Sequence, residues 1–398
     1  MHVAYFAPSW PPAYAANGIV TYVAAMRQYL ISCGHEVSVV TADGIFSGEP
    51  IVTQARKPSR IARSLRGWWD RLTDDTRSSA ARIGAQFQAL HRAKPIDIIE
   101  MEESFGWSAA VASMIRIPLV MRLHGPFFLY PQAVNSERSE RATQNRNKGE
   151  ARAFASARAM TAPSRTTLAQ VCSRFDCATK ATAIIPNPVR ANTSDELWRS
   201  SAADTNLLLW VGRFTKLKGP DRILAAFAKA VESRPALRLE MVGPDHGFLL
   251  DSGEFLGAED YCTRFLAPEV RQRVFFRGLL TPSEIAALRL KAGLTVITSR
   301  RENFPYAVVE AMGAGCPFVA TRWDGIDELV TDGVTGWVVN PDDPAALAAV
   351  LLSALEDVEG REQRGRAGWQ HCQNTLSLNK VGEQTLHFYR SVLAGSSV

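Results

Sequence analysis

The part of this chain that most constrains its fold is residues 294–323, LTVITSRRENFPYAVVEAMGAGCPFVATRW. It begins with an apolar, β-branched run of strand length (294–298). A polar segment that ends in proline follows (299–305), and then helix formers with apolar residues at helical spacing (306–314). A glycine, a cysteine and a proline end that helix before a second apolar run (317–321). The order strand, loop, helix, strand predicts a βαβ unit in a parallel sheet.

Two carboxylates of this stretch, Glu302 and Glu310, lie where a βαβ unit binds ligands. Glu302 is expected on the loop after the first strand, and Glu310 in the first turns of the helix. Open α/β sheets bind ligands at the carboxyl ends of their strands, and a helix amino terminus favours anions such as a diphosphate. Acidic residues are also common in ordinary first turns, so surface charge explains the two glutamates equally well when they are taken alone.

The wider pattern, S-R-x-E-x-F-P-x-x-x-x-E-A-M-x-x-G-x-P-x-x-A-T, resembles the Glu-x7-Glu signature of family-four retaining nucleotide-sugar glycosyltransferases. Asn303 stands where that family usually has glycine. The resemblance implies an α/β fold of two Rossmann-like domains that face each other across a cleft, the GT-B architecture. It also implies that Glu310 holds the ribose hydroxyls, and that Glu302 holds the sugar with the backbone of Asn303 and Phe304.

The same resemblance implies a division of the chain into two domains. At 398 residues the chain is long enough for two α/β domains of common size. An acceptor domain is expected over residues 1–190, joined by a C-terminal helix at about 380–398. A donor domain is expected over residues 205–378, after a mostly polar linker.

The first domain offers two candidate site residues, Gly18 and His124. A strand, a glycine loop, a helix at 18–32 and a second strand form a nucleotide-type unit, in which Gly18 allows close backbone approach to a phosphate. Asn17 replaces the first of two adjacent family glycines, and we expect the turn to survive because asparagine tolerates left-handed conformations. His124 follows a strand at 119–123. A structural histidine is one explanation, whereas the resemblance implies contact with the donor sugar near the reacting carbon.

The second domain carries a basic loop after its first strand. The segment GRFTKLKG (212–219) resembles the family pattern G-R-x-x-x-x-K-G, which implies that Arg213 and Lys218 bind the diphosphate. Cationic side chains neutralise such a leaving group. A basic surface turn is the alternative. Arg277 follows a short strand at 274–276, where the family holds the nucleobase through backbone groups.

The sequence predicts a site without metal or cofactor, in which the nucleotide diphosphate sugar is the donor. No Asp-x-Asp triplet occurs in the chain, which argues against the metal-dependent, single-domain transferases. No side chain is an obvious covalent nucleophile. We therefore expect front-face attack, in which the leaving phosphate takes the proton of the acceptor.

Composition indicates an ordinary globular protein with a net charge of +5 and no nucleic-acid partner. The six cysteines are scattered without a C-x-x-C pair, which predicts reduced thiols. We find no signal peptide and no apolar run long enough to span a bilayer, and expect a cytoplasmic protein.

One basic stretch, residues 54–94, suggests a peripheral membrane contact. Its ten basic residues accompany apolar residues at helical spacing, including Trp68 and Trp69. A basic amphipathic helix with tryptophans can lie on an anionic bilayer, although an ordinary surface helix that packs on its domain fits somewhat better. The polar stretch 135–148 is a candidate acceptor loop. Together these features favour a glycan or lipid-linked glycan acceptor, as in cell-surface polysaccharide synthesis.

Three alternatives were weighed against this interpretation. A nicotinamide-dependent oxidoreductase should show G-x-G-x-x-G after the first strand, and residues 9–18 lack it. A non-catalytic sugar-binding protein would have lost Glu310, Lys218 or Arg213, and all three are present. A nucleotide-sugar epimerase of the same architecture remains open. The sequence does not name the base, the sugar, the acceptor, the linkage or the oligomeric state.

Overall fold

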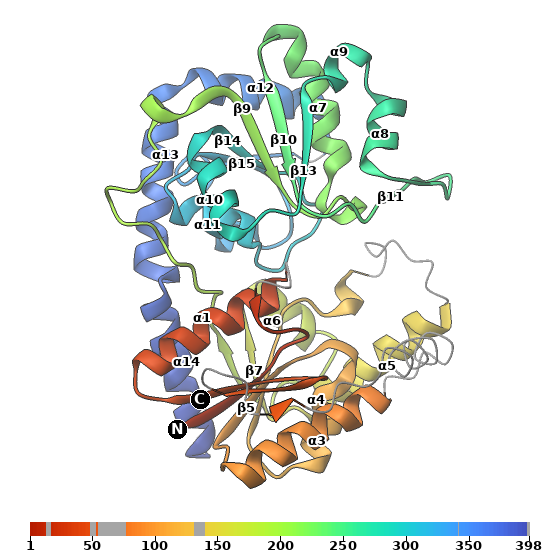
Figure 1. Cartoon of the computed structure of the whole chain (residues 1–398), viewed down its shortest axis with the longest axis vertical. Helices are drawn as coiled ribbons and strands as arrows, with labels where there is room; N and C mark the ends of the chain where they lie inside the picture. Colours follow the sequence, from red (N-terminus) through yellow and green to blue (C-terminus); the bar gives the residue numbers. More distant parts are fainter. Residues whose placement is uncertain (13–16, 48–52, 55–76, 131–139, 341, 396–398) are drawn as a thin grey trace. The chain divides into compact units, whose positions relative to one another are not determined.

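The computed structural model describes the chain except for residues 13–16, 48–52, 55–76, 131–139, 341 and 396–398 (Figure 1). The chain divides into two compact units. Unit 1 consists of Met1–Pro131, Ser136–Pro188 and Leu378–Val398, and unit 2 consists of Gln132–Asn135 and Val189–Ser377.

Unit 1 is built on a mostly parallel sheet. Its described strands lie in the order β4-β3-β2-β1-β5-β6-β7-β8, and only the β2–β3 and β3–β4 pairs are antiparallel. Because β2 and β5 lie on opposite sides of β1, the chain changes direction across the sheet between β1 and β5. The strands are β1 (His2–Phe6), β2 (Glu36–Thr41), β3 (Gly44–Ser47), β4 (Thr53–Gln54), β5 (Ile98–Glu102), β6 (Leu119–Arg122), β7 (Ala159–Ala162) and β8 (Ala181–Ile184).

Helices cover both faces of the unit 1 sheet. They are α1 (Gly18–Ser32), α3 (Arg77–Ala93), α4 (Trp107–Met114), α5 (Glu140–Ser156), α6 (Arg165–Cys172) and α14 (Leu378–Leu393), with short 3-10 turns at Ser104–Gly106 and Phe127–Leu129. Alternate residues of β1 face opposite sides, as strand geometry requires. Phe6 packs in one apolar cluster with Phe87 of α3. Tyr5 instead meets α14 through a 3.0 Å hydrogen bond between the hydroxyls of Tyr5 and Tyr389. The chain therefore returns to unit 1 after completing unit 2.

The described part of the basic stretch is an ordinary domain helix. In α3, Ile83 and Phe87 are fully buried and Leu90 nearly so, so this apolar stripe packs on the unit 1 sheet. Residues 55–76, with Trp68 and Trp69, lie outside the described residues. Nowhere in the part of the chain that the structure describes is a helix both long and apolar enough to cross a membrane.

Unit 2 is built on a fully parallel sheet in the order β13-β10-β9-β14-β15-β16. These strands are β9 (Asp204–Val211), β10 (Arg238–Val242), β13 (Val274–Gly278), β14 (Ala292–Ile297), β15 (Phe318–Thr321) and β16 (Trp337–Val339), and β11 (Phe248–Leu249) pairs with β12 (Phe255–Leu256) in a separate hairpin. Consecutive β9 and β10 lie on one side and β14 on the other, so the change of direction falls between β9 and β14. The two parallel sheets confirm the predicted α/β class.

The helices of unit 2 are α7 (Pro220–Ser233), α8 (Ala258–Phe265), α9 (Pro268–Arg271), α10 (Pro282–Lys291), α11 (Tyr306–Gly313), α12 (Pro344–Glu356) and α13 (Val358–His371), with short turns at Ser200–Ala202, Lys216–Lys218, Ile326–Glu328 and Cys372–Leu376. The main core joins β9 and β14 to α7 and α12, and a second core packs α11 against β15. A capping box begins α10: the Thr281 side chain accepts from the backbone of Glu284, and the Glu284 carboxylate accepts from the backbone of Thr281.

Three local predictions were wrong. Cys172 and Cys177 form a disulfide with their Cα atoms 5.4 Å apart, because the turn after α6 brings the two side chains together; four thiols remain free. Asn17 does not adopt a left-handed conformation. It is extended (φ −139°), and its side chain caps α1 by accepting from the backbone of Ile19. Residues 140–148 are not a loop but the first turns of α5, where Arg146 forms an ion pair with Glu150 one turn later. The acceptor contact predicted for residues 135–148 stays a prediction.

Candidate functional site

The basic loop after β9 lies against the loop after β14, at the point where the unit 2 sheet changes direction. Gly219 adopts a left-handed conformation (φ +65°), and an added Cβ would lie 2.0 Å from the backbone oxygen of Thr298. The Thr298 hydroxyl lies 2.7 Å from the Gly219 oxygen and 3.2 Å from the Lys218 oxygen. Only glycine permits this approach, which brings the end of the basic loop directly against the signature stretch.

Arg300 ties the same two loops together from the other side. Its guanidinium donates to both carboxylate oxygens of Asp221, at 2.8 and 2.6 Å, and to the Lys216 backbone oxygen at 2.8 Å. A bidentate pair of this kind is strong and fixes orientation. Arg300 is the arginine of the S-R-x-E pattern, but the sequence does not reveal its role, because its partner Asp221 lies 79 residues away.

Lys218 and Glu302, predicted to hold the diphosphate and the sugar, are direct partners here. Lys218 Nζ lies 2.5 Å from Glu302 Oε1, which also accepts from the Ser299 hydroxyl at 2.6 Å. Both side chains are mostly buried. The pair leaves a fixed cation and a fixed carboxylate side by side at the edge of the sheet.

Arg213 and Lys216 differ in how far they are committed to protein partners. Arg213 is exposed and forms no ion pair with any residue that the structure describes. Lys216 is paired with Asp251. Arg213 is therefore the better placed of the two to meet an anionic ligand, and its predicted contact with the diphosphate stays a prediction.

Glu310 lies on α11 and is held by a buried arginine that the sequence did not suggest. Arg289 Nη2 lies 2.9 Å from Glu310 Oε2. The Arg289 side chain is 3% exposed and that of Glu310 is 40% exposed. The carboxylate thus remains accessible to a ligand while its other side is anchored.

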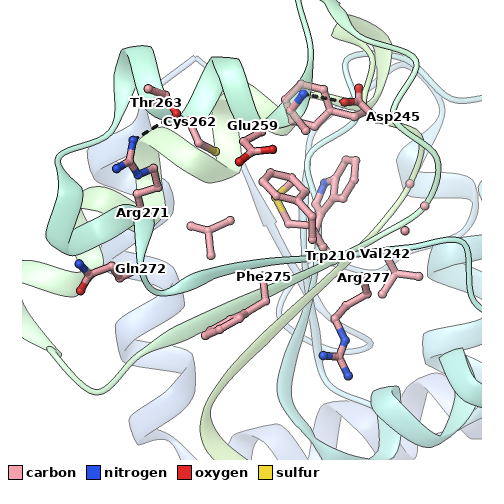
Figure 2. Close-up of a pocket in the computed structure, with 18 residues that line it drawn as sticks. Trp210, Val242, Asp245, Glu259, Cys262, Thr263, Arg271, Gln272, Phe275 and Arg277 are labelled. Atoms are coloured by element: carbon pink, nitrogen blue, oxygen red, sulfur yellow. Dashed lines mark hydrogen bonds between the residues drawn. The ribbon is translucent and has the colours of Figure 1, made fainter.

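A cavity of about 780 Å³ opens beside these loops, along β13 and under α8 (Figure 2). Glycines at the carboxyl ends of three neighbouring strands contribute to its wall, and the side chains that line it are largely apolar and aromatic, including Trp210, Phe214 and Phe276. In Figure 2, Arg277 points away from the labelled residues of α8, and its Nε lies 3.5 Å from Glu240 Oε2. A cavity lined by apolar and aromatic side chains at the ends of strands suits a flat, partly apolar ring.

His124 and Gly18 belong to unit 1. His124 is positioned by Glu103, whose carboxylate accepts from the His124 backbone at 3.0 Å and from the Gly125 backbone at 2.7 Å. The imidazole meets the Tyr22 ring edge-on, with centroids 5.1 Å apart. Burial first, and the charge of Arg122 second, hold the pKa of His124 well below its usual range. His124 is therefore a neutral imidazole at neutral pH.

Gly18 is the first residue of α1, directly after the Asn17 cap, and is exposed. Because residues 13–16 lie outside the described part of the chain, the structure gives no geometry for the rest of the loop that was predicted to approach a phosphate.

Three buried carboxylates behind His124 were missed by the sequence. Burial and the neighbouring charge of Glu103 raise the pKa of Glu102 to about 8 and that of Glu150 to about 7. Glu150 accepts from the Phe127 backbone at 2.7 Å, so two acids, Glu103 and Glu150, hold the loop that follows β6. The one signal in the sequence was the adjacent acidic pair at the end of a strand.

Within the described residues, no group of three or more His, Cys, Asp or Glu side chains is arranged to hold a metal ion.

Two family models match the chain, and together they span both units. Residues 195–371 match the model described as Glycosyl transferases group 1, and residues 16–193 match the model described as Glycosyltransferase Family 4. The chain belongs to the family-four glycosyltransferases.

Curated relatives of this family-four glycosyltransferase include two proteins named D-inositol 3-phosphate glycosyltransferase. The one from Thermobifida fusca is 33% identical over 201 residues, which cover 48% of this chain and 43% of that relative. The one from Paenarthrobacter aurescens is 24% identical over 409 residues, which cover 97% and 95% of the two chains. The first match therefore spans less than half of the relative's length.

Solved structures similar to this family-four glycosyltransferase share its fold. Sucrose-phosphate synthase from Thermosynechococcus elongatus has a TM-score of 0.76 at 22% identity, covering 99% of this chain and 100% of that one. HepE from Anabaena, solved in complex with UDP-glucose, has a TM-score of 0.65 at 19% identity, covering 98% and 100%. At these identities the likeness establishes the GT-B fold.

Proposed function

We propose that this protein transfers a sugar from a nucleoside diphosphate sugar to a hydroxyl acceptor, with retention of configuration. The observation that carries the proposal is the cluster at the ends of β9 and β14, where Lys218, Glu302 and the anchored Glu310 accompany the exposed Arg213. Cations, carboxylates and a largely apolar cavity at the carboxyl ends of the strands match the three parts of such a donor: diphosphate, hydroxyl-rich rings and base.

In this proposal each part of the donor has its own residues. Arg213 and Lys218 neutralise the diphosphate, both before and after the bond to the sugar breaks. The Glu302 carboxylate accepts hydrogen bonds from hydroxyls of the sugar, and the backbone of Asn303 and Phe304 binds the sugar beside it. The base enters the cavity at the end of β13, close to Arg277.

The ion pair between Lys218 and Glu302 bears directly on these roles. A diphosphate that binds Lys218 shares it with Glu302, which keeps the lysine side chain oriented while the site is empty. Pre-oriented groups lower the ordering cost of binding.

In unit 1, a neutral His124 suits a donor sugar that becomes cationic as its bond to phosphate breaks. A neutral imidazole can accept or donate a hydrogen bond without placing a positive charge against that sugar. We propose front-face attack, in which the departing phosphate oxygen takes the proton of the acceptor hydroxyl as the new bond forms. Gly18 contributes a backbone approach to the phosphate.

The two cations lead us to propose that turnover needs no metal ion or other cofactor. Activity should persist in excess chelator. Activity that disappears with chelator and returns with magnesium or manganese would contradict this part of the proposal.

For the acceptor, we propose a glycan or a lipid-linked glycan. Inositol phosphate should be among the first acceptors tested in an activity assay, because relatives are named for it. The membrane contact predicted for residues 54–94 remains a prediction from the sequence. Sedimentation with anionic and neutral vesicles tests it: retention in the supernatant with both would leave a soluble acceptor as the better proposal.

The nucleotide-sugar epimerase of the same architecture is the nearest competitor. Saturation-transfer NMR with a panel of nucleotide sugars identifies the donor, and incubation with that donor separates the two reactions. An epimerised nucleotide sugar, formed without any acceptor, would favour the epimerase, whereas a new glycosidic product only with acceptor supports the transferase. Binding without any product would indicate a non-catalytic sugar-binding protein.

Calorimetry of nucleoside diphosphate binding tests the proposed site. Arg213→Ala and Lys218→Ala should each weaken binding by about 1.5–3 kcal/mol, as expected for a lost charge-assisted contact. Arg238→Ala is the matched control, because this exposed arginine starts β10 at the opposite end of the sheet and pairs with Asp204. Unchanged affinity in both site variants would refute the diphosphate assignment.

A further inference from the structure

We propose that Arg289 is a positioning residue that holds the Glu310 carboxylate for the vicinal hydroxyls of the donor ribose, and so gives the site its preference for ribonucleotides over deoxyribonucleotides. The inference rests on the proposed function, in which Glu310 accepts from the ribose. It adds a residue that does not itself touch the ligand and a specificity that the Glu310 contact alone does not define.

The two members of the pair differ sharply in exposure. Arg289 is 3% exposed and Glu310 is 40% exposed, and they meet through one contact of 2.9 Å between Arg289 Nη2 and Glu310 Oε2. A symmetric surface ion pair would expose both members. Here the arginine is buried and the carboxylate is accessible, as expected when a buried residue orients a ligand-binding group.

The backbone around Arg289 is fixed by its neighbours. Arg289 lies in the last turn of α10, and its backbone oxygen accepts from the Cys316 thiol, 3.5 Å away in the turn after α11. Leu290, the next residue, packs against the same apolar core as Val309 of α11. A buried arginine on a backbone held in this way limits the rotamers of the Glu310 side chain, which would otherwise lose that freedom only when a ligand binds.

Few groups other than Glu310 can balance the buried charge. The Nε atom of Arg289 is buried without a hydrogen-bond partner among the described residues. An arginine charge is permanent, and a buried unpaired charge is strongly destabilising. Glu310 is the partner of that charge, and a carboxylate that faces an arginine acts as a hydrogen-bond acceptor.

The remaining acceptor capacity of Glu310 defines the ligand chemistry. A carboxylate offers about four lone-pair directions, and the recorded contact with Arg289 involves Oε2 alone. The Oε1 oxygen can still accept hydroxyl protons, and two adjacent hydroxyls on one ring are the natural match. A deoxyribose lacks one of them, so binding it forfeits a charge-assisted hydrogen bond.

The test measures discrimination between ribose and deoxyribose rather than affinity alone. UDP, GDP and ADP are first titrated into the full-length wild type by calorimetry, and the tightest binder is then compared with its 2′-deoxy analogue. The wild type should prefer the ribonucleotide by about tenfold or more, the usual range for one charge-assisted hydrogen bond. Glu310→Gln and Arg289→Leu should both reduce this ratio to within about threefold of unity, and Arg289→Lys should restore part of it.

Two further variants separate positioning from general damage. In the Glu310→Gln background, adding Arg289→Leu should leave the ratio unchanged, because Arg289 acts through Glu310. Arg361→Leu is the matched control: it removes another buried arginine of unit 2, whose recorded hydrogen bond goes to the Gly293 backbone, and it should keep the wild-type ratio. If Arg289→Leu does not fold, as judged by circular dichroism, Arg289→Gln takes its place in the same comparison.

The outcomes distinguish the two levels of the argument. Loss of discrimination in Glu310→Gln but not in the charge-removing Arg289 variants would overturn the positioning role and leave the proposed function intact. Wild-type discrimination retained in Glu310→Gln, or no binding of any nucleotide to the wild type, would overturn the assigned ribose contact and the proposed donor site with it.

Discussion

Replacing Gly219 by alanine should loosen the contact between the two loops of the proposed donor site. Gly219 has a φ of +65°, and its added Cβ would lie 2.0 Å from the Thr298 backbone oxygen and 2.9 Å from the Thr298 carbonyl carbon. The left-handed conformation alone costs a residue with a side chain roughly 1–2 kcal/mol. The steric contact adds to this, because the neighbour is backbone and cannot rotate away.

The size of the second contribution follows from the bonds that would be lost. Separating the loops by about 1 Å removes the overlap but breaks the hydrogen bond that the single Thr298 hydroxyl proton shares between the oxygens of Lys218 and Gly219, a net contribution of about 0.5–1.5 kcal/mol. The total for Gly219→Ala is therefore about 1.5–3.5 kcal/mol. In a unit of this size, 1 kcal/mol lowers the melting temperature by about 2–4 °C.

Gly253→Ala is the matched control in the same unit. Gly253 has a φ of +87°, but an added Cβ would meet nothing within 4 Å, so only the conformational cost of about 1–2 kcal/mol applies. Melting curves of both variants, read by circular dichroism, give the difference. Calorimetry should also show weaker nucleoside diphosphate binding in Gly219→Ala, since Lys218 moves, and unchanged binding in Gly253→Ala. Equal melting shifts in the two variants would refute the steric argument.

Three further predictions concern protons and thiols. The pKa of Glu102 is raised from 4.5 to about 8, so the folded state keeps a proton that the unfolded state has already released. The melting temperature of the wild type should therefore fall as pH rises from about 4.5 to 8, and it should fall less in Glu102→Gln. The pKa of His124 is lowered, so its contribution to stability is complete above about 6.5 and is lost as pH falls below that; His124→Gln should remove this loss, measured as melting temperature against pH, and an identical profile would contradict it. Thiol titration of the unfolded, unreduced chain should find four thiols, since Cys172 and Cys177 are paired; six would reject the disulfide.

The site residues that the sequence could identify are those placed by local order. In residues 294–323, the spacing of the apolar residues and the positions of glycine and proline predicted strand, loop and helix. They therefore placed Glu302 just after a strand and Glu310 on the helix that follows. The Thr281 capping box was equally local, since its partners are three residues apart. Arg213 and Lys218 were found for the same reason, as a basic loop directly after a strand.

The predictions that failed depended on what lies nearby in space. Cys172 and Cys177 carry no sequence signal beyond their number, and their pairing depends on how the turn after α6 closes. The adjacent acids Glu102 and Glu103, at the end of β5, were given no role from the sequence. In the structure, Glu103 accepts from the backbone of His124, 21 residues away, and so positions it.

The sequence by itself thus determined which loops end at the ligand-binding edge, because secondary-structure periodicity and turn chemistry are properties of neighbouring residues. Only the tertiary structure decided which charges meet there. Lys218 and Glu302 are 84 residues apart, Arg300 and Asp221 are 79 apart, and Arg289 reaches Glu310 across two helices and a strand. The strength of each pair depends on how far packing removes it from water, and that burial exists only once distant segments have come together.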